Sequence, residues 1–158
     1  KGDISLDMSG WKDFAVKFDS LYQEDLLKGR MGASPTIISD YWFPASHLDF
    51  YIASPNHLNL LAIGPLNDIH HFAWLNKRRP RLTKGSDAYF IYPSNYYGPP
   101  KASLKKDFTL VEDSVTIPAY KFKKRVRNFI IYRMHDYTGF PDEYLIPEIK
   151  EQLRHILQ

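Results

Sequence analysis

The sequence contains no cysteine among its 158 residues. This absence excludes disulfide bonds, catalysis by a thiol and every zinc site that depends on cysteine ligands. The sequence also has no run near the roughly 18 apolar residues that a membrane span requires. Its longest apolar stretches, such as 58–63, have the length of a strand. The chain begins at Lys1 with a polar segment, which predicts that it is cut from a larger protein.

Glycine is scarce, with 8 residues, and it forms none of the familiar phosphate-binding loops. Neither G-x-G-x-x-G nor the P-loop pattern is present, and no G-x-S-x-G marks a nucleophilic serine. The segment after the first predicted strand has no glycine, which argues against a dinucleotide-binding domain. No zinc-finger or RNA-binding signature occurs either. The sequence therefore predicts no cofactor and no metal.

Aromatic and basic residues are what the sequence does have. Aromatics make up 15% of the chain, and the net charge is only +3, but the positive charges are clustered. Such clusters suit an anionic surface such as lipid headgroups, phosphates or nucleic acid. A solvated charged face is the alternative interpretation. The predicted contact residues are Lys77, Arg78, Arg79, Arg81, Lys121, Lys123, Lys124, Arg125 and Arg127.

The first half of the chain alternates helical and extended patterns. Apolar residues at helical spacing predict an amphipathic helix that begins near Trp11 and ends near Gly29 to Gly32. Strands alternating with short helices favour a parallel sheet with right-handed crossovers. The predicted strands are 36–39, 58–63 and 88–92, and the predicted helices between them are 45–53 and 66–76.

The second half has a different pattern. A helical turn over 102–107 precedes two extended segments, 108–117 and 120–134, which should meet around Pro118 and Ala119 as an antiparallel pair at the sheet edge. Alternation in the second segment places Tyr120, Phe122, Val126, Ile130 and Tyr132 on one side. A last helix is predicted over 142–157, with Pro147 in its first turns.

These elements predict one soluble α/β domain over residues 1–158. Its architecture should be three-layer-like, with a mainly parallel sheet of roughly three strands that the antiparallel pair extends and helices flank.

Three segments that leave predicted strand ends carry the candidate site. Ligands of open α/β sheets bind outside the carboxyl ends of the strands, so in a parallel sheet these segments should meet. Together they offer aromatic rings, which stack on sugar rings, and polar groups that hydrogen-bond sugar hydroxyls. Bracing of the loops by the same aromatics is the alternative. The candidate substrate-binding residues are Asp40, Trp42, His47, Asp49, Asn67, Asp68, His70, His71, Asn95, Tyr96 and Tyr97.

These residues also suggest two other chemistries. Asp68 and His71 could share a helix face, and His47 or Asp49 would have to complete a zinc site. Against this stands the interpretation that Asp68 caps the helix and that the histidines pack locally. General acid–base catalysis by Asp40, Asp49 or Asp68 lacks a visible pair at fixed spacing.

Three segments carry a resemblance to a known family. They are the run 42–51 (WFPASHLDFY), the run 64–74 (GPLNDIHHFAW) and the run 87–91 (DAYFI). The region 10–139 resembles the C-terminal extracytoplasmic domain of bacterial membrane glycosyltransferases. Those proteins are similar to the dolichyl-phosphate-mannose protein mannosyltransferases and to the lipid A aminoarabinose transferases.

The resemblance implies a domain that helps to shape or cap the site of an enzyme using a polyprenyl-phosphate-linked sugar. The catalytic carboxylate of that family lies in the membrane region, so the resemblance assigns no catalytic residue to this chain. It implies an extracytoplasmic, periplasmic location at the inner membrane. The implied partners are the membrane region of the same polypeptide and an anionic lipid or lipid-linked sugar, with no nucleic acid. A stand-alone carbohydrate- or nucleotide-binding module and a nucleic-acid-binding domain remain as alternatives.

Overall fold

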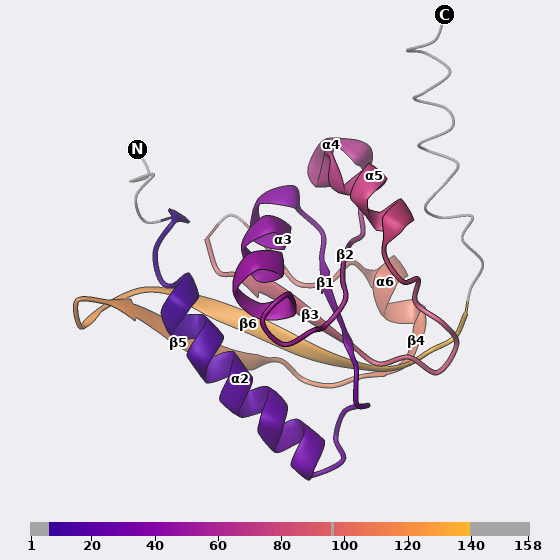
Figure 1. Cartoon of the computed structure of the whole chain (residues 1–158), viewed down its shortest axis with the longest axis horizontal. Helices are drawn as coiled ribbons and strands as arrows, with labels where there is room; N and C mark the ends of the chain where they lie inside the picture. The colour runs from indigo at the N-terminus through magenta and orange to yellow at the C-terminus, as the bar shows by residue number, and fades with distance from the viewer. Residues whose placement is uncertain (1–6, 96, 140–158) are drawn as a thin grey trace, which may run out of the picture.

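Three parallel strands form the centre of the sheet. The computed structural model describes residues 7–95 and 97–139. β1 (Thr36–Ser39) lies between β2 (Leu60–Ala62) and β3 (Ala88–Pro93) and pairs parallel with both (Figure 1). Every residue of these strands is buried, as expected for parallel strands that are covered on both faces. The prediction of a parallel sheet is confirmed.

Antiparallel strands widen this sheet on the side of β3. The long strand β6 (Lys124–Tyr137) pairs antiparallel with β3, and two shorter strands share its other edge. β4 (Phe108–Val111) pairs with the end of β6, and β5 (Val115–Lys121) pairs with its beginning. The result is a mixed α/β domain with a six-stranded sheet, in which the order along the main path is β2-β1-β3-β6-β4.

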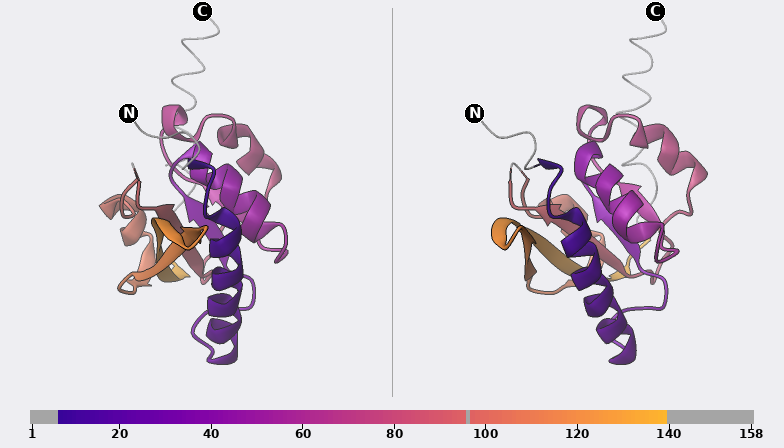
Figure 2. Two further views of the ribbon diagram at one scale, coloured as in Figure 1. Left: turned by 90° about the vertical axis from the view of Figure 1, so that its left-hand side faces the viewer. Right: turned by 60° about the vertical axis from the view of Figure 1, so that its left-hand side comes forward.

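Helices cover the sheet on both sides (Figure 2). α2 (Trp11–Leu27) and α3 (Trp42–Leu48), which continues as a π-helical turn over Asp49–Ala53, pack on one face. The short helix α6 (Ala102–Lys106) packs against the smaller core on the other face.

Aromatic rings join α2 to the sheet. Trp11, Phe14 and Phe18 are fully buried, which explains the helical spacing of these residues in the sequence. The rings of Phe14 and Phe129 stack with 3.9 Å between their centres, so α2 is held directly on β6.

The predicted helix over 66–76 is divided. It consists of α4 (Leu66–Ile69), α5 (Phe72–Leu75) and a 3-10 turn over Asn76–Arg78. The break falls at His70, whose φ of 48° is outside the helical region. The side chain of Asn76 then covers the edge of β2, accepting a hydrogen bond from Ala62 N at 3.3 Å and donating one to Ala62 O at 2.7 Å.

The predicted break at Pro118 and Ala119 was wrong. Both residues belong to β5, and the chain reverses at Phe122 and Lys123 instead. Proline is tolerated there because β5 pairs with β6 alone among the described strands, and an edge strand can spare one N–H group.

The predicted alternation from Tyr120 to Tyr132 was also wrong, because the β5–β6 register shifts between Ala119 and Tyr120. Val126 packs against the core under α2, whereas Ile130 and Tyr132 pack against the opposite core.

Other boundaries moved by a few residues. The helix expected over 45–53 begins at Trp42, and the strand expected over 58–63 is limited to Leu60–Ala62. The predicted helix over 142–157 lies outside the described residues. Within the described residues, no helix has the length and apolar character needed to cross a bilayer.

Candidate functional site

The carboxyl ends of the three parallel strands bring the predicted segments to one edge. The strand order 2-1-3 means that the chain leaves β1 toward β2 and then crosses to β3 on the other side. Open α/β sheets bind ligands in a crevice at such a reversal, and this rule places the expected crevice between the segments that follow β1 and β3. Tyr41 after β1 and Tyr97 after β3 meet across this point, with 5.1 Å between their ring centres.

Asp40 is the residue that directly follows β1. It is only 7% exposed, and its Oδ1 atom accepts no hydrogen bond from the residues that the structure describes. Burial, with a smaller contribution from the nearby carboxylate of Asp68, raises the pKa of Asp40 to about 6, although a hydrogen bond from its own backbone and the charge of Lys101 act in the opposite direction. Buried carboxyl oxygens usually have partners, so the Oδ1 atom without one, beside the expected crevice, is a candidate for ligand contact.

A close approach of two loops holds Asp40 in place. A Cβ atom on Gly64 would lie 3.1 Å from the carbonyl oxygen of Asp40 and 3.3 Å from Cγ2 of Ile69. The segment after β2 therefore needs glycine at this position in order to pack against the segment after β1.

Aromatic and charged side chains lie on the segments near Asp40. Trp42 opens α3 and is 39% exposed, and its ring centre lies 5.5 Å from that of His70 and 6.3 Å from that of His71. Lys101 Nζ lies 4.0 Å from Oδ2 of Asp68, so the segment after β3 contacts α4. The structure thus gathers Asp40, Trp42, Asp68, His70, His71 and Tyr97 at one edge.

Asp68 does not cap a helix as the local-packing interpretation held. It lies within α4, where Pro65 occupies the N-cap position and no side-chain cap is formed. A zinc site gains no support, because the described residues contain no group of three or more histidines and carboxylates placed to hold a metal.

His47 on α3 is half-buried and faces α2. Its ring stacks on Trp11 at 4.6 Å, and its Nδ1 lies 3.0 Å from the carbonyl oxygen of Phe43. Burial lowers the pKa of His47, so the neutral ring is favoured.

Asp49 faces a different part of the protein. It forms a two-point ion pair with Arg79, with contacts of 3.0 Å and 2.7 Å. Among the other candidates, Asn67 is exposed on α4, Asn95 lies in the turn after β3, and Tyr96 lies outside the described residues. Tyr41 and Lys101 are part of the site but were not predicted individually.

The opposite edge of the parallel strands carries different features. An open hollow of about 480 Å³ is lined there by Thr36 and Leu60 and by the Asp49–Arg79 pair. Its strongest charges neutralise each other, and it lies away from the carboxyl ends of the strands. We therefore place the candidate site at Asp40 and not in this hollow.

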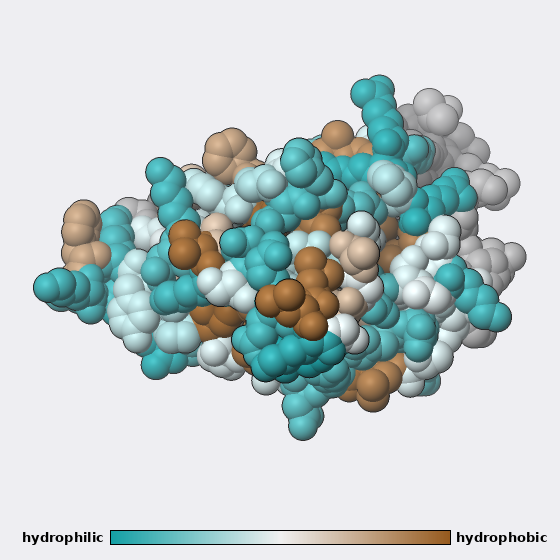
Figure 3. Space-filling view, turned by 60° about the horizontal axis from the view of Figure 1, so that its bottom comes forward, coloured by the Kyte–Doolittle hydropathy of each residue, from teal (hydrophilic) through white to brown (hydrophobic). Residues whose placement is uncertain are grey.

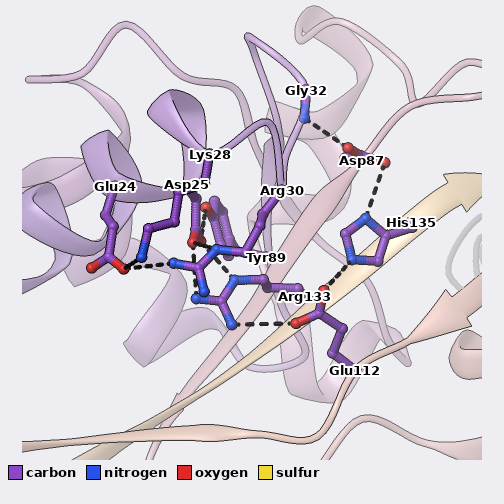
Figure 4. Close-up of polar contacts among 10 residues, drawn as sticks. All are labelled: Glu24, Asp25, Lys28, Arg30, Gly32, Asp87, Tyr89, Glu112, Arg133 and His135. Atoms are coloured by element: carbon purple, nitrogen blue, oxygen red, sulfur yellow. Dashed lines mark hydrogen bonds and ion pairs between the residues drawn. The ribbon is translucent and has the colours of Figure 1, made fainter.

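A polar network ties the same opposite edge together (Figure 4). Arg133 lies between Asp25 and Glu112, and Glu112 Oε1 is 2.9 Å from Nε2 of His135. Asp87 accepts a hydrogen bond from the backbone of Gly32 at 2.7 Å. These charged groups contact one another, so we interpret the network as one that stabilises the fold.

The predicted basic contact residues form two clusters, one over 77–81 and one over 121–127, and both are only partly at the surface. Arg79 is tied to Asp49, and Arg127 is 5% exposed, with its guanidinium over the ring of Trp11. The remaining predicted contact residues are exposed: Lys77, Arg78, Arg81, Lys121, Lys123, Lys124 and Arg125.

Comparison with known proteins identifies no relative of this chain. The chain matches no family model, no curated protein and no solved structure. The function therefore has to be argued from the site itself.

Proposed function

We propose that this chain is a sugar-recognising accessory domain of a membrane glycosyltransferase that uses a polyprenyl-phosphate-linked sugar. The observation that carries the proposal is the buried carboxylate of Asp40, whose Oδ1 accepts no hydrogen bond from the described residues, at the expected crevice between the segments that carry Trp42 and Tyr97. The domain would help to shape or cap the donor and acceptor site, while the chemistry takes place in another part of the polypeptide.

The chemistry of the crevice supports a sugar. An exposed indole offers an apolar face to the C–H groups of a pyranose, and a carboxylate accepts hydrogen bonds from its hydroxyl groups. Asp40 and Asp68 supply acceptors, whereas Lys101 and His70 supply donors beside Trp42. This mixture of one aromatic face with several convergent polar groups is typical of small-ligand sites.

The membrane context comes from the resemblance of residues 10–139 to the extracytoplasmic domains of glycosyltransferases. The same crevice would also serve a stand-alone carbohydrate-binding module. The coding sequence upstream of Lys1 separates the two. Several spans of about 20 apolar residues would support the accessory domain, whereas a short polar lead-in would support the module.

Direct titration tests the crevice. Two-dimensional NMR of the isotope-labelled chain should show shifts at Trp42 and around Asp40 as neutral hexoses, pentoses, amino sugars and sugar phosphates are added. A single sugar unit should bind with a Kd on the order of 1 mM, since its contact area is small.

Three variants make the test specific. Asp40→Asn and Trp42→Ala should each weaken binding by about tenfold. Phe50→Ser removes an aromatic ring that is 70% exposed elsewhere and should leave the Kd unchanged. Shifts that are absent at saturating sugar, or that survive both crevice variants, would overturn the proposal.

A further inference from the structure

The β5–β6 hairpin ends in an unusual turn. Lys121 pairs with Lys124, and the two residues between them have positive φ angles, 50° for Phe122 and 63° for Lys123. A two-residue turn of this kind favours asparagine and glycine, because most side chains are strained there. Phenylalanine at this position weakens the turn, so its presence calls for a reason other than the fold.

Phe122 is also the most exposed large hydrophobic side chain of the described residues. It is 90% exposed, and Tyr120, two residues earlier, is 43% exposed. Figure 3 shows an apolar side chain among hydrophilic ones at the left-hand end of the molecule, where the hairpin lies. The core offers Phe122 no place, because the ring stands beyond the last strand pair.

Four cations surround this ring. Lys121, Lys123, Lys124 and Arg125 are all exposed, and residues 114–135 contain no acidic residue. Lys121 Nζ lies 3.1 Å from Ser9 Oγ and 6.0 Å from the centre of the Phe122 ring, and Arg125 donates to the side chain of Asn128. The tip therefore presents one apolar ring within a field of positive charge.

We infer that the tip of this hairpin contacts a bilayer surface rich in anionic phospholipid. An aromatic ring at the apex can enter the boundary between headgroups and acyl chains, while the flanking cations remain among the lipid phosphates. A solvated charged loop would account for the lysines but not for Phe122. Nucleic acid would favour several rings along a groove on which successive bases stack, and not one ring at the apex of a turn.

The position of the hairpin fits this role. β6 pairs with β3 only from Phe129 onward, so residues 124–128 extend beyond Pro93, the last residue of β3. Figure 1 shows the hairpin as the part of the sheet that reaches farthest from the other strands. It projects past the carboxyl end of β3, and a bilayer at the tip would not need to contact the core of the domain.

Vesicle co-sedimentation tests the inference with the chain as it is. Binding should be strong with vesicles of phosphatidylcholine containing phosphatidylglycerol and weak with phosphatidylcholine alone, and it should fall as salt is added. Lys123→Glu with Lys124→Glu should lower the affinity by about 25-fold or more, since each cation near an anionic surface contributes about fivefold. The matched control, Lys77→Glu with Arg78→Glu in the other basic cluster, should lower it much less.

Phe122→Asn separates membrane contact from folding. Asparagine tolerates the positive φ angle, so this variant should unfold at the same or a higher temperature than the parent chain. It should nevertheless bind anionic vesicles about tenfold less tightly. Phe50→Ser removes another exposed ring, which is 70% exposed on a different surface, and should have no effect.

A fluorescent label reports the depth of the tip. Because the chain has no cysteine, Phe122→Cys and Phe50→Cys each give a single labelling site for an environment-sensitive dye. The dye at 122 should shift to the blue with anionic vesicles, and the dye at 50 should not. Equal vesicle binding by the parent and Phe122→Asn, or tighter binding of a single-stranded oligonucleotide that depends on the same lysines, would overturn the inference. The sugar titration uses a different surface, so the failure of either test leaves the other standing.

Discussion

Arg133 on β6 holds the carboxylate of Asp25 on α2 through two hydrogen bonds. Arg133 Nε donates to Oδ2 at 2.6 Å and Nη2 donates to Oδ1 at 3.0 Å, and Tyr89 Oη donates to Oδ2 at 2.7 Å. Asp25 is fully buried and Arg133 is 4% exposed. The pair joins α2 to the sheet at a point from which water is excluded, so each charge depends on the other.

Arg133→Met should therefore destabilise the domain strongly. The substitution leaves the carboxylate of Asp25 buried with only Arg30 as a cationic partner, and breaking a buried pair of this kind costs about 3–5 kcal/mol. Urea unfolding followed by circular dichroism measures the loss. Lys28→Ala removes a cation from an exposed pair with Glu24 and should change the free energy of unfolding by less than about 1 kcal/mol. Equal effects of the two variants would show that the pair contributes little.

Asp40 makes the stability of the protein depend on pH. Its pKa is about 6 in the folded protein, against an ordinary value of 3.8, so the folded state binds the proton more tightly than the unfolded chain does. The contribution of Asp40 to the stability of the folded protein should then fall as the pH rises from about 4 to about 6, by an amount on the order of 3 kcal/mol. Above pH 6 the buried carboxylate is charged, and this loss is complete.

Asp40→Asn removes this effect and should stabilise the domain at pH 7 by about 1–3 kcal/mol. The same substitution should weaken sugar binding. Higher stability together with weaker binding is expected when a group that destabilises the fold is retained for function. Urea unfolding at pH 4, 5, 6 and 7 checks it, with the difference between parent and variant as the readout. A difference that does not change between pH 4 and 7 would contradict the raised pKa.

The side chain of Asn76 protects the edge of β2. Asn76→Ala removes two hydrogen bonds to Ala62 and exposes an unpaired strand edge, so we expect a loss of about 1–2 kcal/mol and an increased tendency to aggregate. Thermal unfolding and light scattering measure the two effects. Asn67→Ala, at an exposed position of α4, is the matched control and should change neither.

Local sequence patterns identified the parallel core well. The strand over Thr36–Ser39 was predicted with its observed bounds, because a short apolar run after a proline and before a polar loop has few other interpretations. The β5–β6 turn was missed, since Phe122 and Lys123 are not turn residues and Pro118 is. Which proline ends a strand depends on whether that strand has a second neighbour, and the sequence does not carry this information locally.

In the candidate site too, some features follow from local sequence patterns and others depend on the assembled sheet. The rule that ligands bind at strand ends was enough to bring Asp40, Trp42 and His70 together. His47 and Asp49 follow the same strand but lie farther along α3 and the π-helical turn. Helix rotation there turns His47 against Trp11 and Asp49 toward Arg79, which the rule does not foresee. No local signal singled out Lys101, because its contact with Asp68 exists only once the sheet is assembled.

Two glycines with positive φ angles should respond differently to alanine. Gly10 precedes α2 with φ at 87°, and a Cβ there would lie 3.0 Å from both Ala119 Cβ and Val126 Cγ2. Gly29 follows α2 with φ at 62°, and a Cβ there would meet no atom within 4 Å. Gly29→Ala should cost only the backbone strain, about 1 kcal/mol, whereas Gly10→Ala should add a steric term and cost about 2–4 kcal/mol.

Thermal unfolding of the two variants measures this difference directly. Because Gly10 lies against the hairpin strands β5 and β6, Gly10→Ala should also disturb the amide resonances of Ala119 and Val126, and Gly29→Ala should leave them unchanged. If both variants lost the same stability, the close approach of the α2 start to the hairpin would not contribute to it. Contacts such as those of Lys17 with Pro118 O at 2.7 Å and of Asp13 with Tyr120 N at 3.0 Å would then hold the base of the hairpin without it.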